Sequence, residues 1–91
     1  MPTVYVFTQT NCPKCPAAKR VVTEAFDGSG VRVEIVDLDN MDPDLEFRLL
    51  EEQVFIASTP SIVLENNGSL RLLYSGQVPT IDDIRSQVRV E

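Results

Sequence analysis

Residues 3–15 of the chain read TVYVFTQTNCPKC and contain its only two cysteines, Cys12 and Cys15. The segment Thr3–Thr8 is rich in β-branched and aromatic residues, which is typical of a β-strand. A short polar turn follows, and Lys14–Phe26 is predicted to form a helix. The cysteines therefore lie where a strand gives way to a helix, and a C-x-x-C pair in this setting indicates redox chemistry.

The position of the cysteines predicts how they react. A sulfur at a helix N-terminus faces unpaired N–H groups and the positive end of the helix dipole, and both favour the nucleophilic thiolate. Because only two residues separate them, the second sulfur can reach the first within one helical turn. We expect Cys12 to be the nucleophile and Cys15 the more buried resolving thiol, so that the pair cycles between dithiol and disulfide.

The residues around the cysteines leave alternatives open. Pro13 fits the first helical position, where its missing N–H costs little. If Cys12 is the N-cap, Pro16 removes a hydrogen bond to its carbonyl, so we expect a locally adjusted first turn. Lys14 either favours the Cys12 thiolate or contacts partners, and an exposed solubilising lysine explains it equally well.

Length and composition limit the class of protein. The 91 residues, 43% of them hydrophobic, are expected to form one soluble domain over residues 1–91. No run is long and apolar enough for a transmembrane helix, and we expect no signal peptide because no basic segment precedes an apolar one. We therefore expect a cytoplasmic location, where disulfides are usually transient and catalytic.

Acidic residues outnumber basic ones, 14 against 8, and give a net charge of −6. This balance argues against a general nucleic-acid binder, which needs a basic face. The charge is uneven, because Lys14, Lys19 and Arg20 cluster beside the cysteines and no acidic residue precedes Arg20. A basic end of the molecule would help to hold a thiolate, although a solvated helix face explains Lys19 and Arg20 equally well.

Two further elements are predicted after the first helix, which should end near the glycines of residues 28–30. Residues 31–37 alternate apolar and polar side chains, as a strand does. Asp42 or Asp44 can cap a second helix that begins near Pro43 and whose apolar residues follow helical spacing. Those apolar residues are Leu45, Leu49, Leu50 and Val54.

A hairpin and a last helix complete the predicted fold. Asn67-Gly68 is a strong turn signal between strands at residues 61–65 and 70–74. Residues 80–83, TIDD, resemble a capping box that opens a helix through Val90. The order β-α-β-α-β-β-α predicts an α/β fold: a four-stranded mixed sheet with three flanking helices, on both faces, and a parallel first β-α-β unit.

Two other groups of residues are interpreted as structural. Five of the six aromatic side chains are expected in the core or at its edge rather than against a cofactor; they are Tyr5, Phe7, Phe47, Phe55 and Tyr74. The aspartates of residues 37–44 are expected to cap helices and face solvent rather than to hold a metal. Asp82 and Asp83 are expected to be first-turn acids of the last helix, with a contact to the glutathione amine as the alternative.

Taken together, these residues resemble the thioredoxin fold over nearly the whole chain. The resemblance rests on the strand before Asn11-Cys12-Pro13-Lys14-Cys15, on Thr59-Pro60, and on a hairpin that ends at Gly76. The closest-looking members are glutaredoxins and the small glutaredoxin-like thioredoxins of archaea, which share the C-P-x-C form. The resemblance implies a cis peptide bond at Thr59–Pro60 beside the cysteines, and a Thr59 backbone that pairs with an extended substrate.

The chain departs from both families near the site. Glutaredoxins resemble one another in a Gly-Gly pair before the last helix and often in a basic residue before the first cysteine. Here Gly76 is followed by Gln77, and residues 8–11 contain no basic residue. Thioredoxins carry a Trp before the first cysteine and Gly-Pro between the cysteines, whereas this chain has no Trp and has Pro-Lys. The resemblance implies substrate contacts from Pro13, Lys14, Thr59, Pro60 and Gly76.

The main functional hypothesis is a thiol–disulfide oxidoreductase, thioredoxin-like on a glutaredoxin-sized chain, that reduces protein disulfides through Cys12 and Cys15. We expect a monomer, and no bound flavin or nicotinamide because the chain has no Gly-rich nucleotide motif. The expected partners are disulfide-containing proteins, ribonucleotide reductase being one candidate. A thioredoxin-reductase-type enzyme, a ferredoxin-linked reductase, glutathione or another small thiol would reset the pair. The alternatives are a glutathione-dependent glutaredoxin, an iron–sulfur or metal carrier that uses the same cysteines in a dimer, and a redox-inert interaction module.

Overall fold

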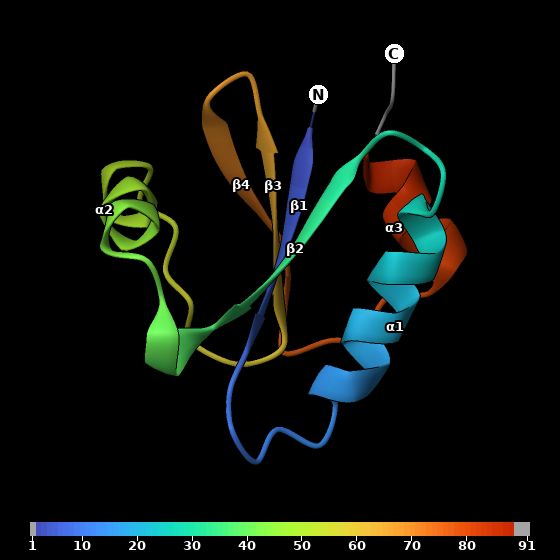
Figure 1. Cartoon of the computed structure of the whole chain (residues 1–91), viewed down its shortest axis with the longest axis horizontal. Helices are drawn as coiled ribbons and strands as arrows, with labels where there is room; N and C mark the ends of the chain where they lie inside the picture. Colours follow the sequence, from blue (N-terminus) through green and yellow to red (C-terminus); the bar gives the residue numbers. More distant parts are fainter. Residues whose placement is uncertain (1, 89–91) are drawn as a thin grey trace.

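The computed structural model describes residues 2–88, and its elements follow the predicted order (Figure 1). The strands are β1 (Thr3–Thr8), β2 (Arg32–Asp37), β3 (Ser61–Asn66) and β4 (Ser69–Ser75). The helices are α1 (Cys15–Phe26), α2 (Pro43–Glu51) and α3 (Ile81–Gln87), with a short 3₁₀ turn, η1, at Leu38–Asn40. No helix in this part of the chain is both long and apolar enough to cross a membrane.

The four strands form one mixed sheet in the order β2-β1-β3-β4. β1 pairs in parallel with β2 and antiparallel with β3, and β3 pairs antiparallel with β4, so the predicted topology is confirmed. α1 and α3 cover one face of the sheet, and α2 lies over the other (Figure 1). β1 is therefore paired at both edges and covered on both faces, and every one of its residues is buried.

Two hydrophobic clusters hold the helices against the sheet. Successive side chains of a strand point to opposite faces. β1 accordingly contributes Val4 and Val6 to the cluster under α1 and α3, and Tyr5 and Phe7 to the cluster under α2. Ile84 of α3 is fully buried in the first cluster. The central strand thus anchors both layers of helices at once.

A polar network joins α2 to the sheet beside the second cluster. Arg48 of α2 forms an ion pair with Glu65 of β3, and the hydrogen bond in this pair raises the pKa of Arg48. The Tyr5 hydroxyl donates to the same carboxylate over 3.5 Å. Burial raises the pKa of Tyr5, and the negative charge of Glu65 raises it further, so this phenol stays neutral over the physiological range.

The first turn of α1 differs from the sequence prediction. The helix begins at Cys15 with Lys14 as its N-cap, so Cys12 and Pro13 lie in the preceding turn. The prediction that Pro13 occupies the first helical position is therefore wrong. Pro16 takes the second helical position, where a backbone N–H has no partner within the helix. The Cys15 N–H donates to the Cys12 carbonyl over 3.3 Å, which is the local adjustment that Pro16 was expected to require.

α2 ends in a motif that the apolar spacing did not reveal. The helix stops at Glu51, and Gln53 adopts a left-handed backbone conformation with φ 57°. The Gln53 N–H donates to the Leu50 carbonyl and the Val54 N–H to the Leu49 carbonyl, which is the Schellman arrangement. Val54 packs in the same cluster as Leu49. Val54 is therefore a core residue, as its spacing indicated, but it lies beyond the helix.

The N-terminal caps of α2 and α3 agree with the sequence predictions, whereas the C-terminal end of α3 does not. The Asp42 side chain accepts a hydrogen bond from a backbone N–H in the first turn of α2, and the Thr80 hydroxyl accepts one from the Asp83 N–H. Both predicted caps are confirmed. α3 ends at Gln87, because the next residue is extended with φ −118° and ψ 106°. The predicted continuation to Val90 is wrong at this point, and Val90 itself lies outside the described residues.

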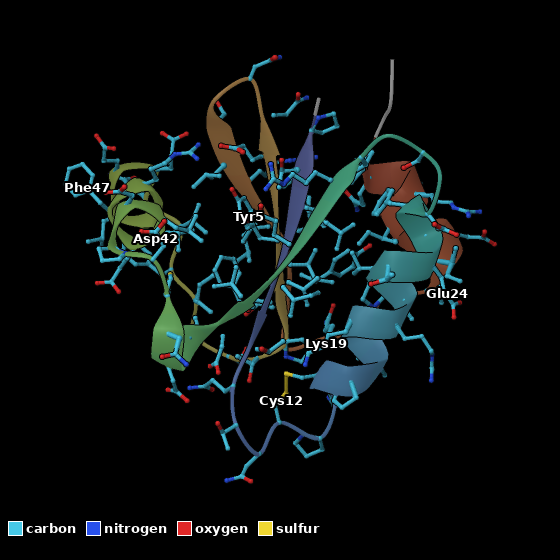
Figure 2. The ribbon with its side chains drawn as sticks, in the orientation of Figure 1. Tyr5, Cys12, Lys19, Glu24, Asp42 and Phe47 are labelled. Carbon is cyan, nitrogen blue, oxygen red and sulfur yellow. A yellow bond between two sulfur atoms is a disulfide. The ribbon has the colours of Figure 1, made fainter. Side chains whose placement is uncertain are left out.

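The five aromatic side chains that were expected at the core divide into two groups. Tyr5 and Phe7 are buried and Tyr74 is half-buried, which confirms their predicted core or core-edge positions. Phe47 and Phe55 are 61% and 67% exposed, so the same prediction is wrong for them. Phe47 lies on the side of α2 that points away from the sheet (Figure 2). α2 thus packs on the sheet through Leu45 and Leu49 and leaves its aromatic residue in solvent.

Adjacent leucines of α2 provide a matched test of this packing. Leu49 is 4% exposed in the cluster under α2, whereas Leu50 is 59% exposed. We predict that Leu49→Ala lowers the free energy of unfolding by about 2–5 kcal/mol, because it removes buried apolar contacts and leaves a cavity. Leu50→Ala should change it by no more than about 0.5 kcal/mol. Urea denaturation measures both, and equal losses would contradict the described packing of α2.

Candidate active site

The two cysteines lie beyond the end of β1, where the chain turns into α1, and Figure 2 shows Cys12 at this end of the molecule. Their sulfurs form a disulfide with an S–S distance of 2.12 Å and Cα atoms 5.4 Å apart. Cys15, the first residue of α1, is 3% exposed, whereas Cys12 is half-buried in the turn before the helix. Cys12 is therefore the cysteine that another molecule can reach.

A second segment lies beside the disulfide because β3 starts next to the end of β1. Ser61, the first residue of β3, pairs with Phe7. The preceding peptide bond, Thr59–Pro60, is cis, as the resemblance implied, and Pro60 is buried. The Thr59 hydroxyl donates to the side-chain oxygen of Gln9 over 3.3 Å. This bond ties the segment directly to the turn that carries the cysteines.

The turn after β4 closes the site. The Gly76 N–H donates to the Pro60 carbonyl over 2.7 Å, and the Lys14 ammonium donates to the Gly76 carbonyl over 3.5 Å. Gly76 has a φ of 75°, and a Cβ at this position would lie 2.8 Å from Oγ of Ser58. Ser58 is itself held by a 3.1 Å hydrogen bond to the Ser75 hydroxyl. Glycine is therefore favoured at residue 76 by its backbone conformation, and a larger residue would also displace the Ser58 hydroxyl.

Two surface pockets flank Cys12. The first, the Gly76-side pocket, is lined among others by Cys12, Lys14, Ser58, Thr59, Gly76 and Gln77. The second, the helix-side pocket, is lined among others by Gln9, Asn11, Cys12, Cys15, Pro16 and Lys19. Asn11, Cys12 and Pro13 are common to both pockets. A bound molecule therefore has room on either side of the Cys12 sulfur.

The structure brings together every residue that the sequence indicated for the site; these are Cys12, Pro13, Lys14, Cys15, Thr59, Pro60 and Gly76. Sequence reasoning did not assign Ser58 to the site, because no pattern distinguishes it from other polar loop residues, and it noted Gln77 only as the residue in place of a second glycine. Lys19 was noted for its charge alone. Across residues 2–88, no group of three or more His, Cys, Asp or Glu side chains is arranged to hold a metal ion.

Comparison with solved structures finds the same fold in several thioredoxins. Mitochondrial thioredoxin 3 from Saccharomyces cerevisiae, in its oxidised form, is 22% identical with a TM-score of 0.67, over 94% of this chain and 74% of that one. Oxidised thioredoxin O2 from Arabidopsis thaliana is 20% identical with a TM-score of 0.69, over 97% and 75%. Trxlp from Edwardsiella tarda is 21% identical with a TM-score of 0.65, over 94% and 80%. Comparison with curated proteins finds no match.

A family model described as a thioredoxin domain matches residues 3–89, which is nearly the whole chain. The match includes the cysteine turn, the segment around the cis peptide bond and the turn at Gly76. A disulfide-linked C-x-x-C pair in this fold supports a thiol–disulfide oxidoreductase in general terms. From its sequence and its fold alike, the chain belongs to the thioredoxin-domain family.

Proposed function

We propose that the protein reduces the disulfides of other proteins by cycling Cys12 and Cys15 between dithiol and disulfide. One observation carries the proposal: the disulfide joins a half-buried Cys12, with a pocket on either side, to a buried Cys15. The pair does little to staple the fold, because the loop that it closes is very short. Reactivity therefore explains this disulfide better than stability does.

The proposed reaction begins when the Cys12 thiolate attacks one sulfur of a substrate disulfide. A Cys12–substrate disulfide forms as the substrate S–S bond breaks, and the leaving thiolate takes up a proton. The deprotonated Cys15 then attacks the Cys12 sulfur, which forms the intramolecular disulfide and releases the second substrate thiol. Two electrons have then passed from the cysteine pair to the substrate, and the pair is in the oxidised state of the structure.

The Gly76-side pocket is the proposed place for the substrate chain around its disulfide. Thr59 lines this pocket together with Cys12, and we propose that its backbone pairs with an extended substrate segment. Pro13, Lys14 and Gly76 line the same pocket and are assigned contacts with that segment. Pro60 is assigned an indirect part, because its carbonyl accepts the Gly76 N–H and so fixes the turn.

The oxidised pair needs an external donor of two electrons. A thioredoxin-reductase-type enzyme, a ferredoxin-linked reductase, or a small thiol such as glutathione would supply them. The proposed substrates are disulfide-containing proteins, with ribonucleotide reductase as one candidate. We further propose that residues 1–91 act as one domain, in monomeric form and in the cytoplasm. These assignments rest on the sequence and stay predictions.

Serine substitution of each cysteine tests the order of attack. Cys15→Ser should accumulate mixed disulfides between Cys12 and the substrate, because no second thiol resolves them. Cys12→Ser should capture little substrate, since Cys15 is only 3% exposed, and should show no reductase activity above background. Non-reducing gels and intact-mass spectrometry after incubation with insulin measure the adducts. Equal capture by the two variants would contradict the assigned roles.

Two features favour protein disulfides over glutathione adducts. Gln77 follows Gly76, where glutaredoxins resemble one another in a second glycine, and residues 8–11 offer no cation ahead of Cys12. A glutathione carboxylate therefore has fewer partners at both places. We predict that the protein reduces insulin in a reaction that needs both cysteines, and that it removes glutathione from a glutathionylated peptide slowly.

The comparison uses wild type and Cys15→Ser with both substrates, each with a reductase-linked and a glutathione-linked donor. A dithiol route requires Cys15, whereas deglutathionylation can run on Cys12 alone. The expected result is loss of insulin reduction in Cys15→Ser. Efficient glutathione-dependent turnover that survives this substitution would overturn the prediction and assign glutaredoxin chemistry instead.

A further inference from the structure

Charge is distributed unevenly around the disulfide. The protein has a net charge of −6. Within residues 2–88, however, no acidic side chain lines either pocket beside Cys12. Each pocket instead contains a lysine, Lys14 in the Gly76-side pocket and Lys19 in the helix-side pocket. Two positive charges therefore flank the accessible sulfur of an otherwise acidic protein.

The fold places both lysines beside the disulfide. Lys14, the N-cap of α1, donates one N–H to the Gly76 carbonyl over 3.5 Å, and its ammonium has further N–H groups for a ligand. Lys19 follows Cys15 by one helical turn, so the two side chains share a face of α1. Figure 2 shows Lys19 and Cys12 at the same end of the molecule. The ion pairs recorded among residues 2–88 involve neither lysine.

The acidic residues of neighbouring segments lie outside the two pockets. Asp39 accepts a hydrogen bond from the Thr10 hydroxyl over 3.4 Å but lines neither pocket. Asp82 and Asp83 belong to the first turn of α3 and also line neither pocket. An acidic segment that approaches Cys12 therefore meets cations on both sides, whereas a basic segment meets like charge.

We infer that Lys14 and Lys19 select substrate disulfides that lie in an acidic protein segment, by pairing with Asp and Glu side chains on either side of the attacked bond. The inference rests on the proposed function, because it names the substrate class of the same cysteine pair. Complementary charges steer encounter and fix orientation more than they add affinity. The selection should therefore show in the rate of attack at low salt.

Matched cyclic peptides test the inference. Three peptides share one intramolecular disulfide and differ only in the residues beside its cysteines, which are Asp, Gln or Lys. Reduced protein is mixed with each peptide without oxygen, and acid-quenched samples give the rate of disulfide loss. Each rate is divided by that of the same peptide with dithiothreitol, which cancels the intrinsic reactivity of the peptide disulfide.

The expected result is a normalised rate for the Asp peptide that exceeds that of the Lys peptide by at least about tenfold at low salt. The ratio should fall toward one in 1 M NaCl, where the Debye length is about 3 Å. Any effect of the lysines on the Cys12 thiolate itself changes both rates alike and leaves the ratio unaltered. The ratio therefore reports charge selection alone.

Charge-matched variants locate the effect. Lys14→Gln combined with Lys19→Gln should abolish most of the Asp-to-Lys ratio. Arg32→Gln combined with Arg71→Gln also removes two positive charges. These two arginines lie near the start of β1, at the opposite end of the sheet from the cysteines. This control should retain both the ratio and the rate on the Gln peptide.

The possible results separate the inference from the function that it rests on. Equal normalised rates for the three peptides, or equal loss of the ratio in both double variants, would overturn the inference and leave the proposed function standing. Failure to reduce any peptide, and insulin as well, would overturn both. Oxidised glutathione is a fourth substrate, because it carries carboxylates without a protein segment. If its normalised rate equalled that of the Asp peptide, an acidic protein segment would not be the selected ligand.

Discussion

The site depends on one row of paired residues across the sheet. Phe7 of β1 pairs with Ser61 of β3, and Ser61 pairs with Ser75 of β4. Each strand leaves the sheet just beyond this row: β1 toward the cysteines, β3 at Thr59–Pro60, and β4 at Gly76. A slip of one residue in the β1–β3 pairing would exchange the valines and the aromatic side chains of β1 between the two clusters. Because the clusters on the two faces of β1 are packed around side chains of different size, packing holds this register, and the register assembles the site.

Local sequence patterns predicted the strands and the hairpin, but they did not predict where some of the helices begin and end. Asn67 and Gly68 both adopt positive φ, 55° and 83°, as their sequence indicated. Gln53 also adopts positive φ, but a glutamine does not predict a left-handed residue after the end of a helix, as a glycine or an asparagine does. Pro13 fits a first helical position by type, yet the helix starts later, because Pro16 has no N–H for the Cys12 carbonyl and the Cys15 N–H bonds it instead. Such choices depend on hydrogen bonds that spacing alone does not specify.

Some features of the active site were likewise predictable from the sequence, and others were not. The cysteines, the Thr59–Pro60 bond and Gly76 were predictable because each carries a motif of the family that the chain resembles. The fit of Ser58 against Gly76 was not, since it depends on how two turns from different parts of the chain approach one another. The exposure of Phe47 likewise depends on which side of α2 meets the sheet. The lysine charges were visible in the sequence. Only the fold shows that, among the described residues, no acidic side chain lines either pocket.

The central claim is that the cysteine pair carries two electrons to a protein disulfide, and a single-turnover stoichiometry tests it most directly. Fully reduced protein is mixed with an excess of a disulfide-bonded protein, without oxygen and without any other donor. Alkylation and mass spectrometry then count the thiols of both proteins as the reaction proceeds. We predict one Cys12–Cys15 disulfide formed for each substrate disulfide lost. Substrate disulfides that stay intact, or that are lost while both cysteines remain reduced, would contradict the claim.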